Sequence, residues 1–387
     1  MKLLNPGPVT LSERVRAAMT QPDLCHREPE FARLQKEIRK RLASVYAAAE
    51  GEFTAVLLTG SGTAAVEAMV GSLVPRNGHA LVAANGVYGE RMAAMVDAQD
   101  KTVHMVRSEW TEPINFAAVD QILSRESRIS HVLAVHHETT TGRLNDIAKL
   151  GAICSHYDVP LLLDCVSSFG GEEIDFESWN LQACAATANK CLHGVPGMSF
   201  VLARRKVLDA GQSGATSVYL DLFRQYVEQR KGSSAFTQSV HVCYALLEAL
   251  GELQDSGGWR GRRSRYAVLS RKVLNGLRSQ GVEPLLDITA PSSSVMTAYR
   301  VPEGYDYSSL HDFLKASGFV IYSGQGQFSQ DIFRIAVMGA VDFSDVDELL
   351  STFGRFWRSR NDAVRCESDS AVGVFACSAT RRAEAGA

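Results

Sequence analysis

The sequence lacks a long apolar run and an excess of positive charge. No stretch of about 18 consecutive apolar residues occurs among its 387 residues, so no membrane-spanning helix is expected. Its formal net charge of −3 gives no basic field of the kind that nucleic-acid binding requires. The first residues, MKLLNPGPVTLSERV, contain too short an apolar segment for a signal peptide. We therefore expect a cytoplasmic protein with no nucleic-acid and no membrane partner.

The sequence also lacks the cysteine spacing of metal sites and disulfide-rich domains. Its cysteines form no CxxC or CxxH pair. Several of them lie in apolar segments, which favours buried thiols over a disulfide framework. They are Cys25, Cys154, Cys165, Cys184, Cys191, Cys243, Cys366 and Cys377.

Apolar runs typical of β-strands alternate with segments of helical periodicity. The runs cover residues 55–59, 79–84, 131–137, 160–164, 184–188 and 198–203. Helical periodicity is clear over residues 62–74 and 145–157. Strands this apolar are expected to be covered on both faces, so we predict an α/β fold with a mostly parallel sheet over about residues 15–260. A ligand site is then expected beyond the carboxyl ends of the strands.

The composition divides the chain into regions. Because 45% of the residues are hydrophobic, the chain can bury a core large enough for two domains. The stretch DSGGWRGRRSR, residues 255–265, is rich in Gly and Arg and is predicted to be a connection. The end of the chain lacks sustained apolar periodicity. We predict an N-terminal segment (1–15), a large domain (16–262), a smaller α+β C-terminal domain (263–357) and a flexible tail (358–387).

One predicted strand runs into Gly60-Ser61-Gly62-Thr63 and then into a helix. Backbone N–H groups at a helix start, together with two glycines and two hydroxyls, make a natural phosphate site. The lysine of a P-loop and the spacing of a GxGxxG motif are both absent. The alternative is a Gly-Ser turn that caps the helix without any ligand.

Asp164 and Lys190 each follow an apolar strand. A carboxylate at the end of a buried strand is unfavourable unless it is paired, so Asp164 is expected to meet a cation or a strong donor. Lys190 lies in AATANKCLHGVPGMSF among small and apolar neighbours, where a desolvated amine could form a Schiff base. The alternatives are a helix cap or a salt bridge for Asp164 and a surface position for Lys190.

Together these three features match the needs of pyridoxal 5'-phosphate. The cofactor requires an anion site, a partner for its pyridinium nitrogen and an amine that holds its aldehyde. The segment around Ser61, then Asp164, then Lys190 supplies them in that order on a parallel sheet. The residues therefore predict a pyridoxal-phosphate enzyme.

Six motifs resemble those of the class V aminotransferases. They are GSGTAAVEA (60–68), NGVYGER (85–91), HHETTTGRLN (136–145), DCVSSFGG (164–171), ANKCLHGVPG (188–197) and FRIAVMG (333–339). The resemblance covers about residues 2–357. Within the family, the sequence most resembles the branch that moves an amino group from 2-aminoethylphosphonate to pyruvate, which gives phosphonoacetaldehyde and alanine. It implies the pyridoxal-phosphate-dependent transferase fold type I, with a seven-stranded sheet in the large domain, and a homodimer with the active site at the interface.

The resemblance also implies roles at the cofactor. Lys190 would hold the aldehyde and, once displaced by substrate, would move the proton. Asp164 would keep the pyridine nitrogen protonated, which makes the ring an electron sink. The other implied contacts are Ser61, Gly62 and Thr63 with the phosphate, Tyr88 over the ring, Thr139 with the phenolic oxygen, Val166, and Thr237 of the partner subunit.

Substrate recognition is implied at several basic residues. Arg334 matches the family's carboxylate-binding arginine, and its planar fork suits that task. The resemblance places the N-terminal segment near the active site and the small domain, and Gly7 with Arg27 and His193 at the substrate. Further cationic candidates for the phosphonate are His26 and Arg143. For each of these candidates the alternative is an ordinary surface ion pair.

Some positions depart from the family pattern. Ala336 and Val337 stand where the family has a glycine and an asparagine, and Thr237-Gln238-Ser239 lacks the usual proline. These departures leave the cofactor chemistry intact and bear on the substrate. An aminotransferase that acts on alanine or serine with glyoxylate, or on another phosphonate, is therefore the alternative.

Other classes of function fit the residues less well. The run His136-His137-Glu138 could suggest a metal site, but adjacent strand residues point to opposite faces and no third ligand has a recognised spacing. A class V cysteine desulfurase usually has a histidine directly before the lysine, where this chain has Asn189. A scaffold without activity would be expected to lose Lys190 or Asp164, and both are present.

Overall fold

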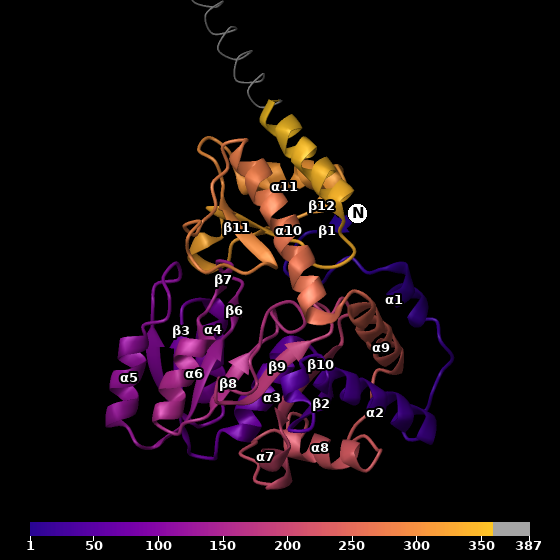
Figure 1. The fold of residues 1–387 in the computed structure, drawn as a ribbon, viewed down its shortest axis with the longest axis vertical. Helices are drawn as coiled ribbons and strands as arrows, with labels where there is room; N and C mark the ends of the chain where they lie inside the picture. Colours follow the sequence, from indigo (N-terminus) through magenta and orange to yellow (C-terminus); the bar gives the residue numbers. More distant parts are fainter. Residues whose placement is uncertain (359–387) are drawn as a thin grey trace, which may run out of the picture.

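The central feature of the fold is a sheet of seven strands. The computed structural model describes residues 1–358 and places this sheet in the larger, lower body of Figure 1. In spatial order the strands are β2 (Phe53–Thr59), β10 (Met198–Arg204), β9 (Leu181–Thr187), β8 (Leu161–Asp164), β5 (Ile129–Val135), β3 (His79–Ala84) and β4 (Thr102–Arg107).

Most neighbouring strands of the sheet are parallel. Strand β10 is the exception, because it runs antiparallel to β2 and to β9, with Val201 opposite Val56 and Ala185. Since β10 is antiparallel to both, β2 and β9 run in the same direction. The carboxyl ends of β2, β8 and β9 therefore meet at one edge, and the prediction of a mostly parallel sheet is confirmed.

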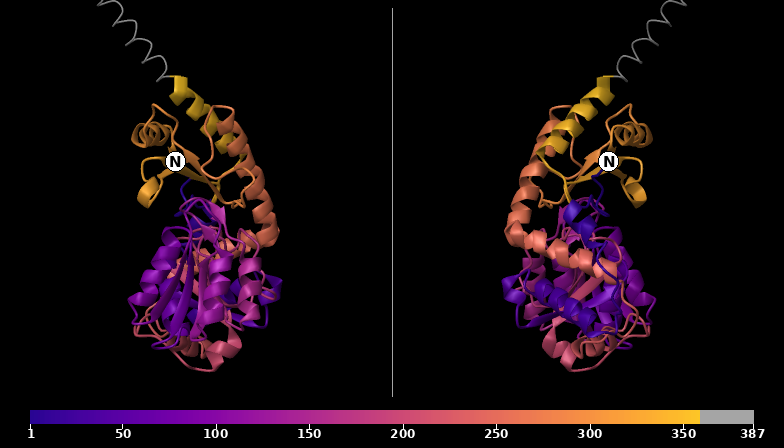
Figure 2. Two further views of the ribbon diagram at one scale, coloured as in Figure 1. Left: turned by 90° about the vertical axis from the view of Figure 1, so that its left-hand side faces the viewer. Right: turned by 90° about the vertical axis from the view of Figure 1, so that its right-hand side faces the viewer.

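Helices cover both faces of the sheet, as Figure 2 shows. Alternate strand residues point to opposite faces, so Ala55 and Leu57 belong to one buried cluster and Val56 and Leu58 to another. The first cluster contains residues of α2 (Pro29–Ala43), α5 (Phe116–Arg125), α6 (Ile147–His156) and α9 (Val240–Asp255). The second contains residues of α3 (Gly62–Leu73), α4 (Val87–Asp97) and α8 (Leu222–Arg230).

A smaller body has its own sheet and core. Its three strands, in spatial order, are β11 (Met296–Arg300), β14 (Ile332–Ala336) and β13 (Tyr322–Ser323), and its helices are α10 (Gly258–Arg278), α11 (Tyr307–Ala316) and a helix over residues 343–358. The start of the chain joins this body, because β1 (Lys2–Leu3) pairs with β12 (Phe319–Val320). Leu4 and Val9 are buried in the same core.

Shorter elements complete the described part of the chain. They are α1 (Glu13–Ala18), η1 (Ala47–Ala49), β6 (His137–Glu138), β7 (Arg143–Leu144), α7 (Arg205–Asp209) and η2 (Gly326–Phe328). Within residues 1–358, none of the helices combines the length and the apolar character that crossing a membrane requires. The predicted tail lies, from residue 359 onward, outside the described residues.

The prediction of a connection over residues 255–265 was wrong. Helix α9 ends at Asp255 and α10 begins at Gly258, so the break is confined to Ser256 and Gly257. Gly257 has φ of 85°, a left-handed conformation that glycine adopts readily and that ends the first helix. Packing explains why α10 forms despite its glycines: buried residues recur along it at helical spacing, among them Trp259, Arg262, Tyr266, Leu269 and Val273.

The cysteine prediction holds for most of the described thiols. Cys154, Cys165, Cys184, Cys191 and Cys243 are free and buried, whereas Cys25 is free and exposed. Cys366 and Cys377 lie outside the described residues.

Candidate active site

A cavity of about 610 Å³ opens beyond the carboxyl ends of the strands. Its wall combines the N-terminal segment, the large body and the small body. The residues that line it are Pro6, Gly7, Thr59, Gly60, Ser61, Gly62, Thr63, Tyr88, Arg91, Val166, Thr187, Asn189, Lys190, Pro196, Gly197, Tyr322, Gln325 and Arg334. Most of the residues that the sequence assigned to a cofactor therefore meet in one place.

Lys190 lies half-buried in this wall, just after β9. Its Nζ donates a hydrogen bond of 2.7 Å to Ser167 Oγ and lies 5.8 Å from the centre of the Tyr88 ring. Gly7 lets the N-terminal segment approach the lysine closely, because a Cβ at Gly7 would lie 3.1 Å from Lys190 Cγ and its φ is 114°. The amine is thus held toward the cavity by a single hydroxyl.

Asp164 is the last residue of β8, and only 6% of its surface is exposed. Its Oδ1 accepts a hydrogen bond of 2.8 Å from the backbone N–H of Val166. Burial raises the pKa of Asp164, while the Val166 N–H and the positive charges of Lys190 and Arg91 oppose this shift. No ion pair to Asp164 is present within residues 1–358, so its carboxylate can accept a hydrogen bond from a ligand.

The phosphate site predicted after β2 is the N-terminus of α3. Ser61 is the N-cap, but its side chain makes no capping hydrogen bond, and the first-turn N–H groups of a helix have no partner within it. Gly62 is required by close approach, because a Cβ there would lie 2.8 Å from Val166 Cγ1. Ser61 and Thr63 are both exposed in the cavity wall.

Tyr88 and Thr139 present polar groups beside this wall. Burial raises the pKa of the Tyr88 hydroxyl, but the Lys190 ammonium and the neighbouring Thr139 and Gln325 side chains outweigh burial, so the pKa is below its ordinary value. Within residues 1–358, Thr139 Oγ1 is buried and forms no hydrogen bond of ordinary length, although it lies close enough to the Tyr88 hydroxyl to lower the pKa of that hydroxyl. A buried hydroxyl without a partner is unfavourable, and a polar atom of a ligand would satisfy it.

Arg334 projects from β14 of the small body and is 3% exposed. Its Nε donates to the carbonyl oxygen of Ser323 at 2.9 Å, and its Nη1 donates to the carbonyl oxygen of Thr139 at 2.9 Å and to Gln325 Oε1 at 3.4 Å. Burial lowers the pKa of Arg334, and Tyr88 is the first of several groups that oppose the shift. The backbone contacts fix the guanidinium at the cavity.

Sequence reasoning missed several residues of the site. Arg91 lines the cavity, and its Cζ lies 4.8 Å from the centre of the Tyr88 ring. It could have been found, because Tyr88 and Arg91 are three residues apart in the same helix, a spacing that places both on one face. Ser167 lies within the DCVSSFGG motif but was given no role, and Tyr322 and Gln325 carried no comparable signal.

Two basic candidates are bonded elsewhere and do not line the cavity. His193 Nε2 bonds with the Tyr266 hydroxyl and accepts a hydrogen bond of 2.8 Å from the Gly339 N–H. Burial lowers the pKa of His193 well below its ordinary value, with further lowering by neighbouring arginines, so the ring is neutral. Arg143 is 4% exposed and donates to the carbonyl oxygen of Thr111.

Three further predicted contacts also lie outside the cavity wall of this chain. His26 and Arg27 are in the segment between α1 and α2, where Arg27 is exposed. Thr237 is exposed as well, and its neighbour Ser239 bonds through its N–H to Thr59 Oγ1 at 3.3 Å. Thr237 therefore lies near the strand that leads to the phosphate site without reaching the cavity.

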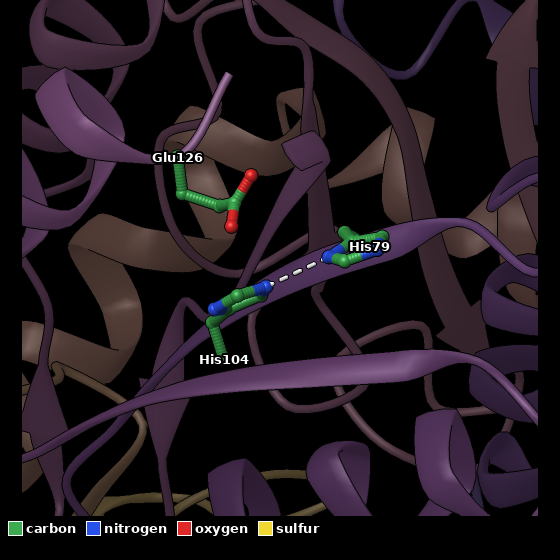
Figure 3. Close-up of side chains that lie close together, drawn as sticks. All are labelled: His79, His104 and Glu126. Atoms are coloured by element: carbon green, nitrogen blue, oxygen red, sulfur yellow. Dashed lines mark hydrogen bonds between the residues drawn. The ribbon is translucent and has the colours of Figure 1, made fainter. Parts of the chain in front are cut away.

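One cluster in the described residues has the chemistry of a metal site. His79 Nδ1 and His104 Nε2 are 3.0 Å apart, and one ligand atom from each of these and Glu126 lie within 4.8 Å of one another (Figure 3). Both Glu126 oxygens are bonded to Arg128, at 2.8 and 2.6 Å, which leaves an imidazole pair beside an ion pair. His79 begins β3, so the cluster lies at the opposite end of the sheet from the cavity.

The adjacent His136 and His137 are part of the protein interior. His136 Nδ1 bonds with Ser168 Oγ and His137 Nδ1 with the carbonyl oxygen of Ser167, each at 3.0 Å. Burial lowers their pKa values to about 3 and about 4 respectively. Both rings are therefore neutral and help to position the segment that carries Ser167.

The donor set of the cavity fits a flat anionic cofactor with a ring nitrogen and an aldehyde. The α3 N-terminus can receive an anion, Asp164 can accept from a protonated ring nitrogen, and Lys190 supplies an amine. The Thr139 hydroxyl, which is buried and forms no hydrogen bond of ordinary length in the described part of the chain, can bond a ring oxygen. Tyr88 and Val166 offer flat and apolar surfaces in the same cavity.

Comparison with known proteins agrees with this geometry. The family model described as aminotransferase class-V matches residues 11–349. A 2-aminoethylphosphonate--pyruvate transaminase of Bacillus mycoides is 37% identical over 356 residues, which are 91% of this chain and 97% of that protein. One of Bacillus cytotoxicus is 39% identical over 352 residues, which are 90% of this chain and 95% of that protein.

The fold prediction is confirmed by solved structures. The crystal structure of a ureidoglycine-glyoxylate aminotransferase from Bacillus subtilis superposes with a TM-score of 0.86 at 24% identity and covers 93% of both chains. This coverage and score show that the two chains share one fold. The chain therefore belongs to the class V aminotransferase family and is an enzyme of that class.

Proposed function

We propose that the enzyme moves an amino group from 2-aminoethylphosphonate to pyruvate, with pyridoxal 5'-phosphate as cofactor, and produces phosphonoacetaldehyde and alanine. The observation that carries the proposal is the meeting of Lys190, the α3 N-terminus and Arg334 in one cavity. The buried Asp164 lies in an adjoining pocket that shares Thr63, Tyr88, Arg91 and Val166 with the cavity wall. The names of the relatives that cover nine-tenths of the chain support the choice of donor and acceptor.

The cofactor would be held by groups of the cavity wall and by Asp164 in the adjoining pocket. When bound, pyridoxal phosphate supplies an aldehyde and a ring that accepts electrons. Ser61, Gly62 and Thr63 would bind its phosphate through backbone N–H groups and hydroxyls. Asp164 would accept from the ring nitrogen, and because its carboxylate is buried, this bond would be stronger than one made in water.

Lys190 would carry the proton that transamination has to move. Its amine would take a proton from the amino-bearing carbon of the substrate and return it to the cofactor carbon that carried the aldehyde. Ser167 Oγ, which accepts from Lys190 Nζ at 2.7 Å, would orient the amine between the two positions. The Gly7 contact limits the space available to the lysine side chain.

Arg334 would receive the carboxylate of pyruvate and alanine. Its Nε and Nη1 are tied to backbone carbonyl oxygens, so the guanidinium is fixed before substrate arrives. Arg91 is the second guanidinium in the wall of this cavity and the further candidate for an anionic group. None of the four basic residues named for the phosphonate from the sequence lines the cavity, and Arg143 and His193 are engaged elsewhere, which favours Arg334 and Arg91 for the phosphonate.

The proposal includes a homodimer with an active site at the interface. Thr237 of the partner subunit would complete the phosphate site, and this is supported because Thr237 is exposed and does not line the cavity of its own chain. Val218, which is 64% exposed, and Tyr219, which is 38% exposed, precede this segment and offer apolar surface. Sedimentation of the active enzyme at assay concentration tests the point, and an active monomer would contradict it.

A screen of amino donors against two acceptors tests the reaction. Purified enzyme loaded with pyridoxal phosphate is mixed with 2-aminoethylphosphonate, alanine or serine, and conversion of the cofactor to its amine form is followed by absorbance. Pyruvate or glyoxylate is then added to measure the return reaction. Fastest conversion by 2-aminoethylphosphonate with return by pyruvate supports the proposal. Fastest conversion by alanine or serine with return by glyoxylate would favour the glyoxylate-type alternative instead.

A further inference from the structure

Glu138 is a carboxylate without exposed surface at the edge of the active site. It ends β6 and is 0% exposed. Within residues 1–358 it makes hydrogen bonds but no ion pair. A buried carboxylate without a cationic partner is unfavourable, so the hydrogen bonds it makes have to offset its loss of hydration.

The hydrogen bonds of Glu138 connect two segments that both lead into the cavity. Its Oε1 accepts from the Thr140 N–H at 3.1 Å and from Thr140 Oγ1 at 2.6 Å, and its Oε2 accepts from the Gly89 N–H at 3.4 Å. Thr140 Oγ1 in turn accepts from the Val87 N–H at 3.1 Å. The two residues that flank Tyr88 are thus bonded to the two residues that flank Thr139.

The backbone at the start of α4 lies directly against this carboxyl group. A Cβ on Gly86 would lie 2.3 Å from Glu138 Cδ and 2.7 Å from its Oε1. Gly86 has φ of 173°, an extended conformation open to any residue, so close approach alone requires glycine here. No side chain fits at position 86, because the Glu138 carboxyl group occupies the space beside the start of α4.

We infer that Glu138 is a positioning residue for the cofactor, which fixes the Tyr88 ring and the Thr139 hydroxyl relative to each other. The inference rests on the proposed function, in which Tyr88 covers the cofactor ring and Thr139 bonds its phenolic oxygen. Glu138 itself does not line the cavity, and it acts through the N–H groups at the start of α4. Displacing α4 relative to the loop after β6 would separate the two contacts that receive one rigid ring.

A glutamine at position 138 keeps the size of the side chain but replaces one of its two acceptor oxygens by an NH2 group. Its amide oxygen can still accept from Thr140, but its NH2 group then faces the Gly89 N–H, so two donors meet and the tie to α4 is lost. Glu138→Gln should therefore weaken pyridoxal phosphate binding without creating a cavity in the protein interior. Thr140→Val removes the acceptor of the Val87 N–H by a different change, and Thr140→Ser keeps it.

The test is a titration of the cofactor-free apoprotein with pyridoxal 5'-phosphate, followed by the absorbance of the bound cofactor. We expect the Kd to rise about tenfold in Glu138→Gln and in Thr140→Val, the effect of losing one buried hydrogen bond, and to return toward wild type in Thr140→Ser. The maximum of the absorbance band should shift in the two weak binders, because the Tyr88 and Thr139 contacts are displaced.

Glu172→Gln is the matched control. Glu172 is 1% exposed and accepts from Ser293 and Ser294, away from the cavity. This variant should unfold at lower urea concentration while its Kd for pyridoxal phosphate stays within about twofold of wild type. A wild-type Kd and an unshifted band in Glu138→Gln and Thr140→Val would overturn the inference alone. Failure of the wild-type protein to bind pyridoxal phosphate would overturn the proposed function and the inference with it.

Discussion

The guanidinium of Arg334 donates a hydrogen bond of 2.9 Å to the backbone carbonyl oxygen of Thr139, 195 positions earlier in the chain. One partner belongs to the small body and the other to a loop beside the central sheet. The bond joins a side chain proposed to receive substrate to a residue proposed to contact the cofactor. Substrate recognition and cofactor placement are therefore mechanically connected across the two bodies.

Replacing Lys190 by alanine should abolish transamination while the protein still folds. The side chain is half-buried and bonded through Nζ to Ser167, so its removal leaves the core intact. Loss of the proton-transferring amine is expected to slow each half-reaction by at least about 100-fold. Stopped-flow absorbance of the loaded variant measures these rates, with Lys149→Ala on the exposed side of α6 as the control. Rates near those of wild type would remove Lys190 from its role.

Replacing Asp164 by asparagine should retain much of the cofactor and lose reaction rate. The amide keeps the size of the side chain but carries no charge to stabilise a protonated ring nitrogen. Charge-assisted hydrogen bonds contribute about 1.5–3 kcal/mol, so the half-reactions should slow by about ten- to a hundred-fold. Asp175→Asn is the control, because Asp175 is half-buried away from the cavity and accepts hydrogen bonds from the N–H groups of Glu177 and Ser178. Half-reaction rates within a few-fold of wild type would show that Asp164 does not have this function.

The fold was largely predictable because its strands are apolar on both faces. The segment HALVAA was predicted as residues 79–84 and forms β3 over the same range. Strand β4 was missed, because TVHMVR lies at the edge of the sheet and is half polar, with exposed residues at both ends. The direction of β10 depends on pairing with β2 and β9, which the local pattern does not encode.

The site was predictable where chemistry and strand ends coincide, and less so elsewhere. Asp164 and Lys190 follow strands whose carboxyl ends meet, so their proximity follows from the topology. The surroundings of His193 depend on Tyr266 and Gly339, which are 73 and 146 positions away. Arg91 was not predicted as a site residue, because an exposed cation on a helix is common and does not by itself indicate a site. Its value as a candidate comes from the cavity around it.

Titration of Glu138 should make the stability difference between wild type and Glu138→Gln depend on pH. Burial raises the pKa of Glu138 from 4.5 to about 6, with Asp164 adding to the shift and the Thr140 and Gly89 donors opposing it. The negative charge of Glu138 in turn raises the pKa of Arg334, against the lowering by burial. Because the folded state binds the proton of Glu138 more tightly than the unfolded state, this proton stabilises the fold. The stabilisation is fully present below about pH 4.5 and is lost as the pH rises through about 6.

The expected size of that difference follows from the shift. A rise of the pKa from 4.5 to about 6 corresponds to about 2 kcal/mol of stability. The free energy of unfolding of wild type should therefore fall by that much relative to Glu138→Gln between about pH 4.5 and pH 7. Urea unfolding of both proteins over this range measures it, and the subtraction cancels the titrating groups that do not interact with Glu138. Curves that stay parallel would mean that Glu138 keeps an ordinary pKa in the folded protein.

Replacing Arg334 by lysine should separate the recognition of the two substrates. Lysine keeps the positive charge but loses the planar fork, and it cannot make both backbone contacts that hold Arg334 to Ser323 and Thr139. A bidentate pair with a carboxylate contributes about 1.5–3 kcal/mol, so the affinity for pyruvate and alanine should fall about ten- to a hundred-fold. Arg300→Lys, exposed on β11 of the same sheet, should change neither half-reaction.

The response of 2-aminoethylphosphonate then tells whether one site receives both anions. If the phosphonate also binds Arg334, its half-reaction should weaken in parallel with that of alanine, since the donor loses the same fork. If Arg91 or another cation holds the phosphonate separately, Arg334→Lys should spare it and Arg91→Gln should weaken it instead. Single-turnover rates for the two donors, measured on both variants against substrate concentration, distinguish these cases. Arg334 was assigned to the carboxylate because, in the described residues, no other guanidinium lining this cavity is fixed by backbone hydrogen bonds. Unchanged kinetics of alanine and pyruvate in Arg334→Lys would contradict this assignment.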